Sequence, residues 1–203
     1  MYSTDQLSTI IPGLPSQPMV KNCFRVISFT ALTKSQPIMP LYVLGPGMNG
    51  QRYTPKNGPN ALYVAEDLIT AQAEYLEIHR AVLIEDPALQ LNPDPTVQLT
   101  IQVCLERVLD LTKPIIQEAL GTSTLELTGS WRRQMIKNIT CPTQVLARVV
   151  YDSGYFQAMR YPSARSNEHA NLIIWVEYLS EPSFVRVYDT SGVMTARIPP
   201  KSI

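Results

Sequence analysis

Residues 57–80 constrain the fold most, because one continuous segment carries the signals of a turn, a strand and a helix start. Asn57-Gly58-Pro59-Asn60 is typical of a turn, since glycine tolerates positive φ and proline fixes its own φ. The apolar run over residues 61–65 has the length of a short strand. Asp67 then predicts a helix that runs to about Arg80, because its carboxylate can accept from the free amides of the first turn.

Three polar side chains are spaced eleven residues apart along this part of the chain: Arg52, Tyr63 and Glu74. They fall after a glycine-rich loop, on the predicted strand and on the predicted helix, so a cation, a phenol and a carboxylate can converge on one cleft. Such a set suits a substrate with anionic phosphates and a flat, positively charged ring. A surface arginine, a core tyrosine and an exposed helical glutamate are the ordinary alternatives.

The composition predicts an ordered, cytoplasmic protein without a metal. Its 203 residues are 45% hydrophobic and 17% charged with a net charge of zero, which favours a folded domain over nucleic-acid wrapping. The apolar runs are too short for a membrane span, and the start of the chain does not resemble a signal peptide. Three widely spaced cysteines and two histidines indicate free thiols rather than a zinc site.

The order of predicted elements favours an α+β fold with a twisted, split, mixed or antiparallel sheet and flanking helices. Residues 1–20 contain Pro12, Pro15 and Pro18 and are predicted to be an extended N-terminal arm before a domain over residues 21–203. Further strands are predicted over residues 22–30, 41–44, 81–84, 96–104, 171–179 and 184–189. Further helices are predicted over residues 112–120 and 143–152.

Three more residues are candidates for a site. Arg25 lies inside an apolar strand, where a charged group should be paired or line a cavity. Ser163 lies in a loop upstream of the strand that Asn171 opens. No glycine elbow flanks Ser163, which argues against a serine-hydrolase triad and favours a hydrogen bond to a ligand, with loop capping as the ordinary alternative.

Taken together, these stretches resemble the RES-domain family, named for its arginine, glutamate and serine. The motifs that carry the resemblance occur in the family's order and spacing: Phe24-Arg25, Gly50-Gln51-Arg52-Tyr53, Gly58-Pro59, Tyr63-Val64-Ala65, Ala71-Gln72-Ala73-Glu74, Tyr161-Pro162-Ser163-Ala164-Arg165 and Asn171-Leu172. Two positions depart from the pattern: Gln51 stands where members usually have glycine, and Thr54 where they have asparagine.

The resemblance implies an ADP-ribosyltransferase-like fold with an NAD+ cleft in a split sheet. It also implies a toxin of a toxin–antitoxin module that depletes cellular NAD+ by cleaving its nicotinamide–ribose bond, through hydrolysis or phosphorolysis. NAD+ would be the substrate, with no metal required. The implied partner is an antitoxin with a DNA-binding domain, and a homo-oligomer is left open.

On this resemblance, Glu74, Arg52 and Tyr63 are the catalytic candidates. Glu74 would hydrogen-bond the nicotinamide ribose and stabilise the oxocarbenium ion that develops there, as in glycoside hydrolysis. Tyr63 would stack on the nicotinamide. Arg52, together with Arg25, would hold the pyrophosphate or a phosphate nucleophile, because the guanidinium fork fits phosphate oxygens.

Three further residues are assigned to NAD+ binding. Tyr53 would form a second wall against the nicotinamide, while Ser163 and Asn171 would orient the substrate by hydrogen bonds. Two other functions stay open: mono-ADP-ribosylation of a protein, and a binding module that kept the fold without the chemistry. The departures Gln51 and Thr54 favour the binding module, whereas the intact arginine, tyrosine, glutamate and serine argue against it.

Overall fold

The computed structural model describes residues 1–33, 39–41, 43–85, 94–137, 139–166 and 168–200. Its strands are β1 (Gln17–Ser28), β2 (Leu62–Ala65), β3 (Thr96–Asp110), β4 (Ala158–Pro162), β5 (Ala170–Ile174), β6 (Phe184–Val187) and β7 (Arg197–Ile198). Its α-helices are α1 (Thr4–Ile10), α2 (Phe29–Thr33), α3 (Leu44–Asn49), α4 (Leu68–Glu85), α5 (Pro114–Ala119), α6 (Thr124–Thr128), α7 (Arg132–Ile136) and α8 (Pro142–Ser153). Short 3-10 helices cover η1 (Ile11–Gly13) and η2 (Val176–Tyr178).

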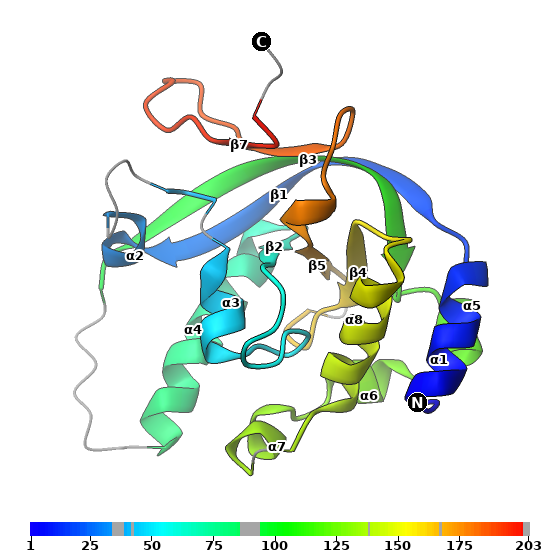
Figure 1. The fold of residues 1–203 in the computed structure, drawn as a ribbon. Coiled ribbons are helices and arrows are strands. Elements are labelled where there is room, and N and C mark those ends of the chain that lie inside the picture. The colour runs from blue at the N-terminus through cyan, green and yellow to red at the C-terminus, as the bar shows by residue number, and fades with distance from the viewer. Residues whose placement is uncertain (34–38, 42, 86–93, 138, 167, 201–203) are drawn as a thin grey trace.

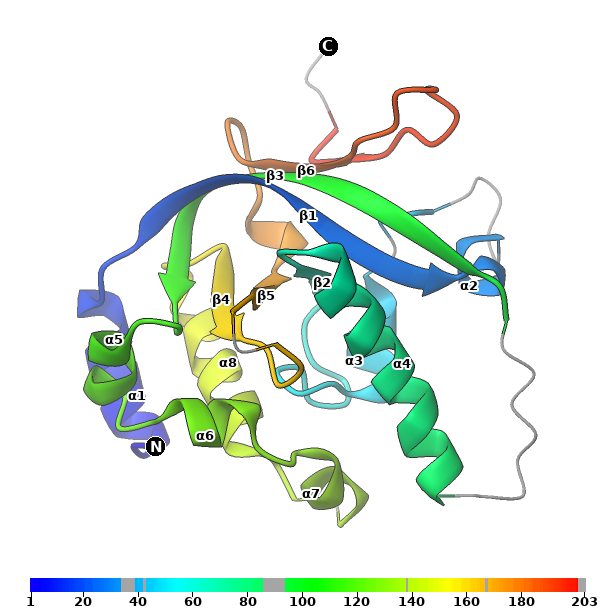
Figure 2. The same ribbon diagram turned by 180° about the vertical axis from the view of Figure 1, so that it is seen from behind.

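The described strands form one mixed sheet that closes on itself. Their order is β1-β2-β5-β4-β3-β6-β7, and β1 also pairs with β3 along most of its length. Only the β3–β4 pairing among these is parallel. The two long strands β1 and β3 arch over the short strands β2, β5 and β4 (Figures 1 and 2). This arrangement confirms the predicted α+β class with flanking helices.

Two hydrophobic cores lie on the two faces of the short strands. Leu62, Val64 and Leu172 face the long strands, and they pack with the alternating inner residues of β3, such as Ile101. The opposite face carries Tyr63, Ile173 and Trp175 and is covered by α1, α5, α6 and α8. Alternation along each strand therefore sorts the side chains, so that Tyr63 is on the helix-covered side of the sheet.

A partly buried ionic network joins the middle of β4 to the ends of β2 and β3. The Arg160 guanidinium on β4 makes two hydrogen bonds of 2.9 Å to the Glu66 carboxylate, which directly follows β2. Arg160 Nη1 also lies 3.2 Å from Asp110 Oδ1 at the end of β3. Burial by itself raises the pKa of the Glu66 and Asp110 carboxyls, but the hydrogen bonds and charge around them outweigh it and hold both pKa values below normal. Both carboxylates are therefore ionised when folded.

Most predicted helix signals are confirmed. Asp67 caps α4, since its Oδ1 accepts from the Thr70 amide at 2.9 Å. Helix α8 begins at Pro142 and ends before Gly154, which takes left-handed φ as a C-cap glycine does. The predicted turn after residue 56 is present, but Asn57 rather than Gly58 has positive φ. Gly58 is required for space instead, because a Cβ there would lie 2.8 Å from the carbonyl oxygen of Pro55.

Several predicted strand bounds are wrong. Residues 81–84 continue helix α4, because the β preference of Val and Ile is weak against a helix that has already been nucleated. The strand predicted over residues 171–179 ends at Ile174, and the one over residues 184–189 ends at Val187. Strand β3 runs six residues beyond the predicted residue 104. Of the strand predicted over residues 41–44, residue 42 lies outside the described residues and Leu44 begins α3.

The prediction of an extended arm over residues 1–20 is also wrong. Ser3 caps α1 through a capping box with Gln6, and Leu7 and Ile11 are fully buried in the helix-covered core. The prolines favour an extended chain, but Pro12 lies in the first turn of η1, where proline is tolerated. Whether residues 1–20 form a unit separate from residues 21–203 stays a prediction.

Leu7 tests whether the N-terminal helix belongs to the core. Because its side chain is fully buried, Leu7→Ala should lower the free energy of unfolding by about 2–5 kcal/mol. Urea denaturation gives the measurement, and Val20→Ala is the control because that side chain is 75% exposed. Equal midpoints for the two variants would contradict the packing of α1.

Arg160 tests the ionic network. Arg160→Met removes the cationic partner of Asp110 and leaves Glu66 with Lys21, 3.3 Å away, so it should lower the free energy of unfolding by about 3–5 kcal/mol at pH 7. The folded pKa values of Glu66 and Asp110 are depressed, so their stabilisation is present above the unfolded pKa values and lost as the pH falls through the folded ones. The gap between wild type and variant should therefore narrow below about pH 4.

Thermal unfolding from pH 7 to 3 measures this gap. Arg148→Met is the control, because the Arg148–Asp152 pair is about half exposed on α8. A gap that stays constant with pH would show that Arg160 acts through packing rather than charge.

Candidate active site

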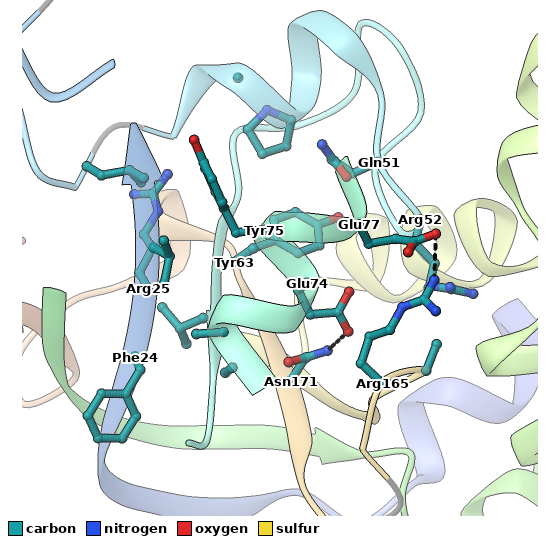
Figure 3. Close-up of a pocket in the computed structure, with 18 of the residues that line it drawn as sticks. Phe24, Arg25, Gln51, Arg52, Tyr63, Glu74, Tyr75, Glu77, Arg165 and Asn171 are labelled. Atoms are coloured by element: carbon teal, nitrogen blue, oxygen red, sulfur yellow. Dashed lines mark hydrogen bonds and ion pairs between the residues drawn. The ribbon is translucent and has the colours of Figure 1, made fainter. Parts of the chain in front are cut away.

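One cleft of about 840 Å³ gathers residues from β1, β2, α4, the turn after α3, the segment before α7 and the loop after β4. Arg52, Tyr63 and Glu74 all line it, together with Arg25 and Asn171 (Figure 3). The three side chains spaced eleven residues apart therefore meet in one cleft. A volume of this size lies in the range of small-molecule sites, about 300–1,000 Å³.

Arg52 is positioned by a tight turn. Gln51 and Thr54 close this turn through two backbone hydrogen bonds, of 2.7 and 3.2 Å. The first turn of α8 holds it from behind, because Thr143 Oγ1 donates to Arg52 O at 2.6 Å and Gln144 Nε2 donates to Gln51 O at 2.9 Å. The turn thus depends on backbone atoms and α8, so glutamine can occupy position 51.

The Arg52 guanidinium joins this turn to the wall of the cleft. Its Nη1 donates to Gly129 O at 2.6 Å and to Leu127 O at 3.2 Å. Both carbonyls belong to the end of α6, which leads into the cleft-lining segment before α7. An arginine has five N–H donors, so these bonds leave further donors for a ligand.

Tyr63 faces the cleft from β2 and is fixed by Thr54. Their hydroxyl oxygens are 2.7 Å apart, and Thr54 is fully buried. Burial raises the pKa of Tyr63, so its phenol stays protonated at neutral pH. The departure of residue 54 from asparagine is thereby accounted for, because the threonine hydroxyl is a hydrogen-bond partner of Tyr63.

Glu74 is held by two neutral donors. Ser163 Oγ donates to Glu74 Oε1 at 2.9 Å. Asn171 Nδ2 donates to the same oxygen at 2.8 Å, as Figure 3 shows. The bonds tie α4 to the loop after β4 and to β5. They fix the direction of the carboxylate and leave Oε2 outside both bonds.

Two residues assigned to substrate contact do not line the cleft. Tyr53 is 1% exposed, and its ring packs on Tyr161 with centroids 4.3 Å apart. It therefore supports the cleft from behind instead of forming the expected second wall. Ser163 is buried as well, and its hydroxyl is occupied by Glu74 and by the amide of Arg165 at 3.0 Å. Its position supports orienting Glu74 rather than the substrate.

Arg25 is a half-buried cation on β1. Its Nη1 donates to Pro40 O at 3.2 Å, and desolvation lowers its pKa to about 10, so it stays charged at neutral pH. Figure 3 shows Arg25 and Arg52 on opposite sides of Glu74. Each guanidinium therefore faces a different part of the cleft.

Sequence reasoning missed several lining residues, among them Tyr75, Glu77, Trp131, Arg132 and Arg165. Helical spacing could have indicated Glu77, which follows Glu74 by three residues on α4. Arg165 follows Ser163 within the same motif. Trp131 and Arg132 had no such signal, because the segment before α7 reaches the cleft only through the tertiary fold.

Across the described ranges, no group of three His, Cys, Asp or Glu residues could hold a metal ion. The helices in these ranges also lack the combination of length and apolar character that crossing a bilayer requires. Free thiols are present at Cys23, Cys104 and Cys141. Burial raises the pKa of Cys23 to about 12, which makes it an inert core side chain.

Comparison with known proteins shows a match to one family model and a similarity to a solved structure. The family model described as RES domain matches residues 23–190. Among solved structures, a chain of the M. tuberculosis MbcT–MbcA toxin–antitoxin complex is similar, with a TM-score of 0.66 and 18% sequence identity. The match covers 91% of this chain and 90% of that chain. The comparison with curated proteins found no match.

The Thr54–Tyr63 pair gives a test of the site's support. Thr54→Val leaves the Tyr63 hydroxyl without this partner and should lower the free energy of unfolding by about 1–3 kcal/mol. Tyr63→Phe in the Thr54→Val background should restore part of that loss, because both polar groups are then removed. Urea denaturation of the two single variants and the double variant measures the coupling, and additive effects would contradict the hydrogen bond.

Proposed function

This chain belongs to the RES domain family, and on that premise we propose that it cleaves the nicotinamide–ribose bond of NAD+. The observation that supports this most is the position of Glu74. Two neutral donors fix its carboxylate in a cleft that Arg52 and Tyr63 also line. The site thus offers negative charge for the ribose, an aromatic face for the nicotinamide and a cation for phosphate.

In the proposed reaction, Glu74 acts by electrostatic stabilisation. As the bond between ribose C1′ and the nicotinamide nitrogen breaks, its electron pair leaves with nicotinamide, and positive charge builds on the ribose. A carboxylate already oriented by Ser163 and Asn171 stabilises this charge without reorganisation. An oxygen of water or phosphate then bonds to C1′, and water would give up its proton.

Aromatic side chains would hold the departing ring. Tyr63 lines the cleft beside Glu74, with Tyr161 in the same wall and Tyr53 packed behind it. Because Thr54 fixes the Tyr63 hydroxyl, the ring keeps its orientation when the cleft is empty. The nicotinamide ring is positively charged before cleavage, so an aromatic face attracts it as a cation.

The closed mixed sheet supports a further proposal about fold type. The cleft lies where β1, β2 and α4 meet, in a mixed sheet whose long strand β1 pairs with β3 along most of its length, while β3 also pairs with β4. We assign this architecture to the ADP-ribosyltransferase type. The likeness to a chain of a toxin–antitoxin complex supports a toxin that depletes NAD+ in the cytoplasm and is controlled by an antitoxin with a DNA-binding domain.

Glu74→Gln tests the catalytic proposal. The amide keeps the shape of the side chain and removes its charge, so turnover of NAD+ should fall about 100- to 1000-fold while the fold is retained. Release of nicotinamide is the measurement, with thermal unfolding as the check on folding. Glu118→Gln is the matched control, because Glu118 is an exposed glutamate on α5 outside the cleft. Near-wild-type turnover by Glu74→Gln would remove Glu74 from the mechanism.

The products of the wild type identify the acceptor. ADP-ribose indicates hydrolysis, and its 1-phosphate, formed only when phosphate is added, indicates phosphorolysis. Labelled NAD+ incubated with cell extract adds a third outcome, since label fixed on one protein band indicates transfer to a side chain. If a purified sample neither binds NAD+ nor consumes it, the protein has the fold but lacks this chemistry.

A further inference from the structure

An ion pair spans the cleft beside Glu74. Arg165 Nη2, from the loop after β4, lies 2.7 Å from Glu77 Oε1 on α4 (Figure 3). Both side chains line the cleft, and they keep 38% and 26% of their side-chain surface exposed. The pair therefore lies in the path of a ligand that enters the cleft.

Arg165 is joined through its backbone to the residues that orient Glu74. Its backbone amide donates to Ser163 Oγ at 3.0 Å, and the same hydroxyl donates to Glu74 Oε1 at 2.9 Å. Glu77 lies three residues after Glu74 on α4, so the two carboxylates share one face of the helix. The backbone from which the Arg165 guanidinium extends is thus fixed relative to the carboxylate proposed to face the ribose.

The arginines that line the cleft differ in their partners. Arg52 donates to the backbone carbonyls of the α6 end, and Arg25 donates to Pro40 O. The Arg132 guanidinium lies 4.8 Å from the centroid of the Trp131 ring. Arg165, by contrast, is held by a part-exposed carboxylate, and ion pairs of this kind contribute little to stability. Its carboxylate partner is therefore one that a stronger anion can replace.

We propose that Arg165 binds the diphosphate of the substrate, and that Glu77 occupies its guanidinium until the substrate arrives. A diphosphate offers the same pair of acceptor oxygens as a carboxylate and carries more charge, so it can displace Glu77. This inference rests on the proposed function, since it names the residue that would recognise the dinucleotide's phosphates. It also gives the two partners opposite effects: Arg165 attracts the ligand, and Glu77 competes with it.

Binding of ADP-ribose, followed by calorimetry, tests this assignment without turnover. Arg165→Gln should weaken binding about 10- to 100-fold, as expected when a charged group loses its hydrogen bonds. Arg165→Lys should fall in between, because it keeps the charge without the fork. Glu77→Gln should tighten binding about two- to fivefold, since it removes the competing carboxylate of an exposed pair. Adenosine, which has no phosphate, should bind all four proteins equally.

Arg148→Gln is the matched control, since Arg148 forms an ion pair of the same length, 2.7 Å, on α8 outside the cleft. It should leave the affinity for ADP-ribose unchanged. Weaker binding by both Arg165→Gln and Glu77→Gln would overturn the proposal and make the pair a structural support of the cleft. An unchanged affinity in Arg165→Gln would overturn it too, as would a wild type that does not bind ADP-ribose.

Loss of NAD+ by the wild type is measured separately, so the two ideas can fail independently. If ADP-ribose binds through Arg165 but NAD+ is not consumed, the diphosphate site stands and the proposed reaction fails. If NAD+ is consumed and Arg165→Gln binds ADP-ribose like the wild type, the reaction stands and the assignment of Arg165 fails.

Discussion

The ionic network around the partly buried guanidinium of Arg160 is the interaction on which the geometry of the cleft depends. It joins Glu66 and Asp110, and these residues mark where β2 and β3 end. Glu66 directly precedes the Asp67 cap of α4, the helix that carries Glu74. Arg160 itself precedes Ser163 by three residues in the strand and loop that hold this glutamate. One ionic network thus fixes two of the three elements whose side chains meet at Glu74 Oε1, namely α4 and the loop after β4.

The opposite wall of the cleft has a separate support. Helix α8 holds the Arg52 turn through Thr143 and Gln144, and Arg52 in turn holds the carbonyls of Leu127 and Gly129. These contacts are mostly between side chains and backbone, so they constrain the path of the chain more than the identity of its exposed residues. A loop fixed in this way can vary in sequence while the guanidinium stays in place.

The sequence predicted elements whose signals are local and missed those set by tertiary packing. Asp67 and Gly154 mark helix ends through their own side chain or φ, and both positions were predicted correctly. Residues 81–84 have a high β propensity, but they continue helix α4, which already extends through this segment. The convergence of Arg52, Tyr63 and Glu74 on one cleft was predicted from the order and spacing of the motifs. That Tyr53 lies behind the cleft depends on how the turn packs against Tyr161, which spacing does not encode.

The partners of the carboxylates distinguish structural residues from candidate catalytic ones. Glu66 pairs with Arg160 and Lys21, and Asp110 pairs with Arg160, so two cations balance these two carboxylates within the fold. Among the described residues, the hydrogen-bond donors to Glu74 are a hydroxyl and an amide, which orient a carboxylate without cancelling its charge. Glu74 is thus oriented by neutral donors in a cleft that several guanidiniums also line. An arrangement of this kind favours a ligand that is anionic along its length and becomes cationic at one carbon.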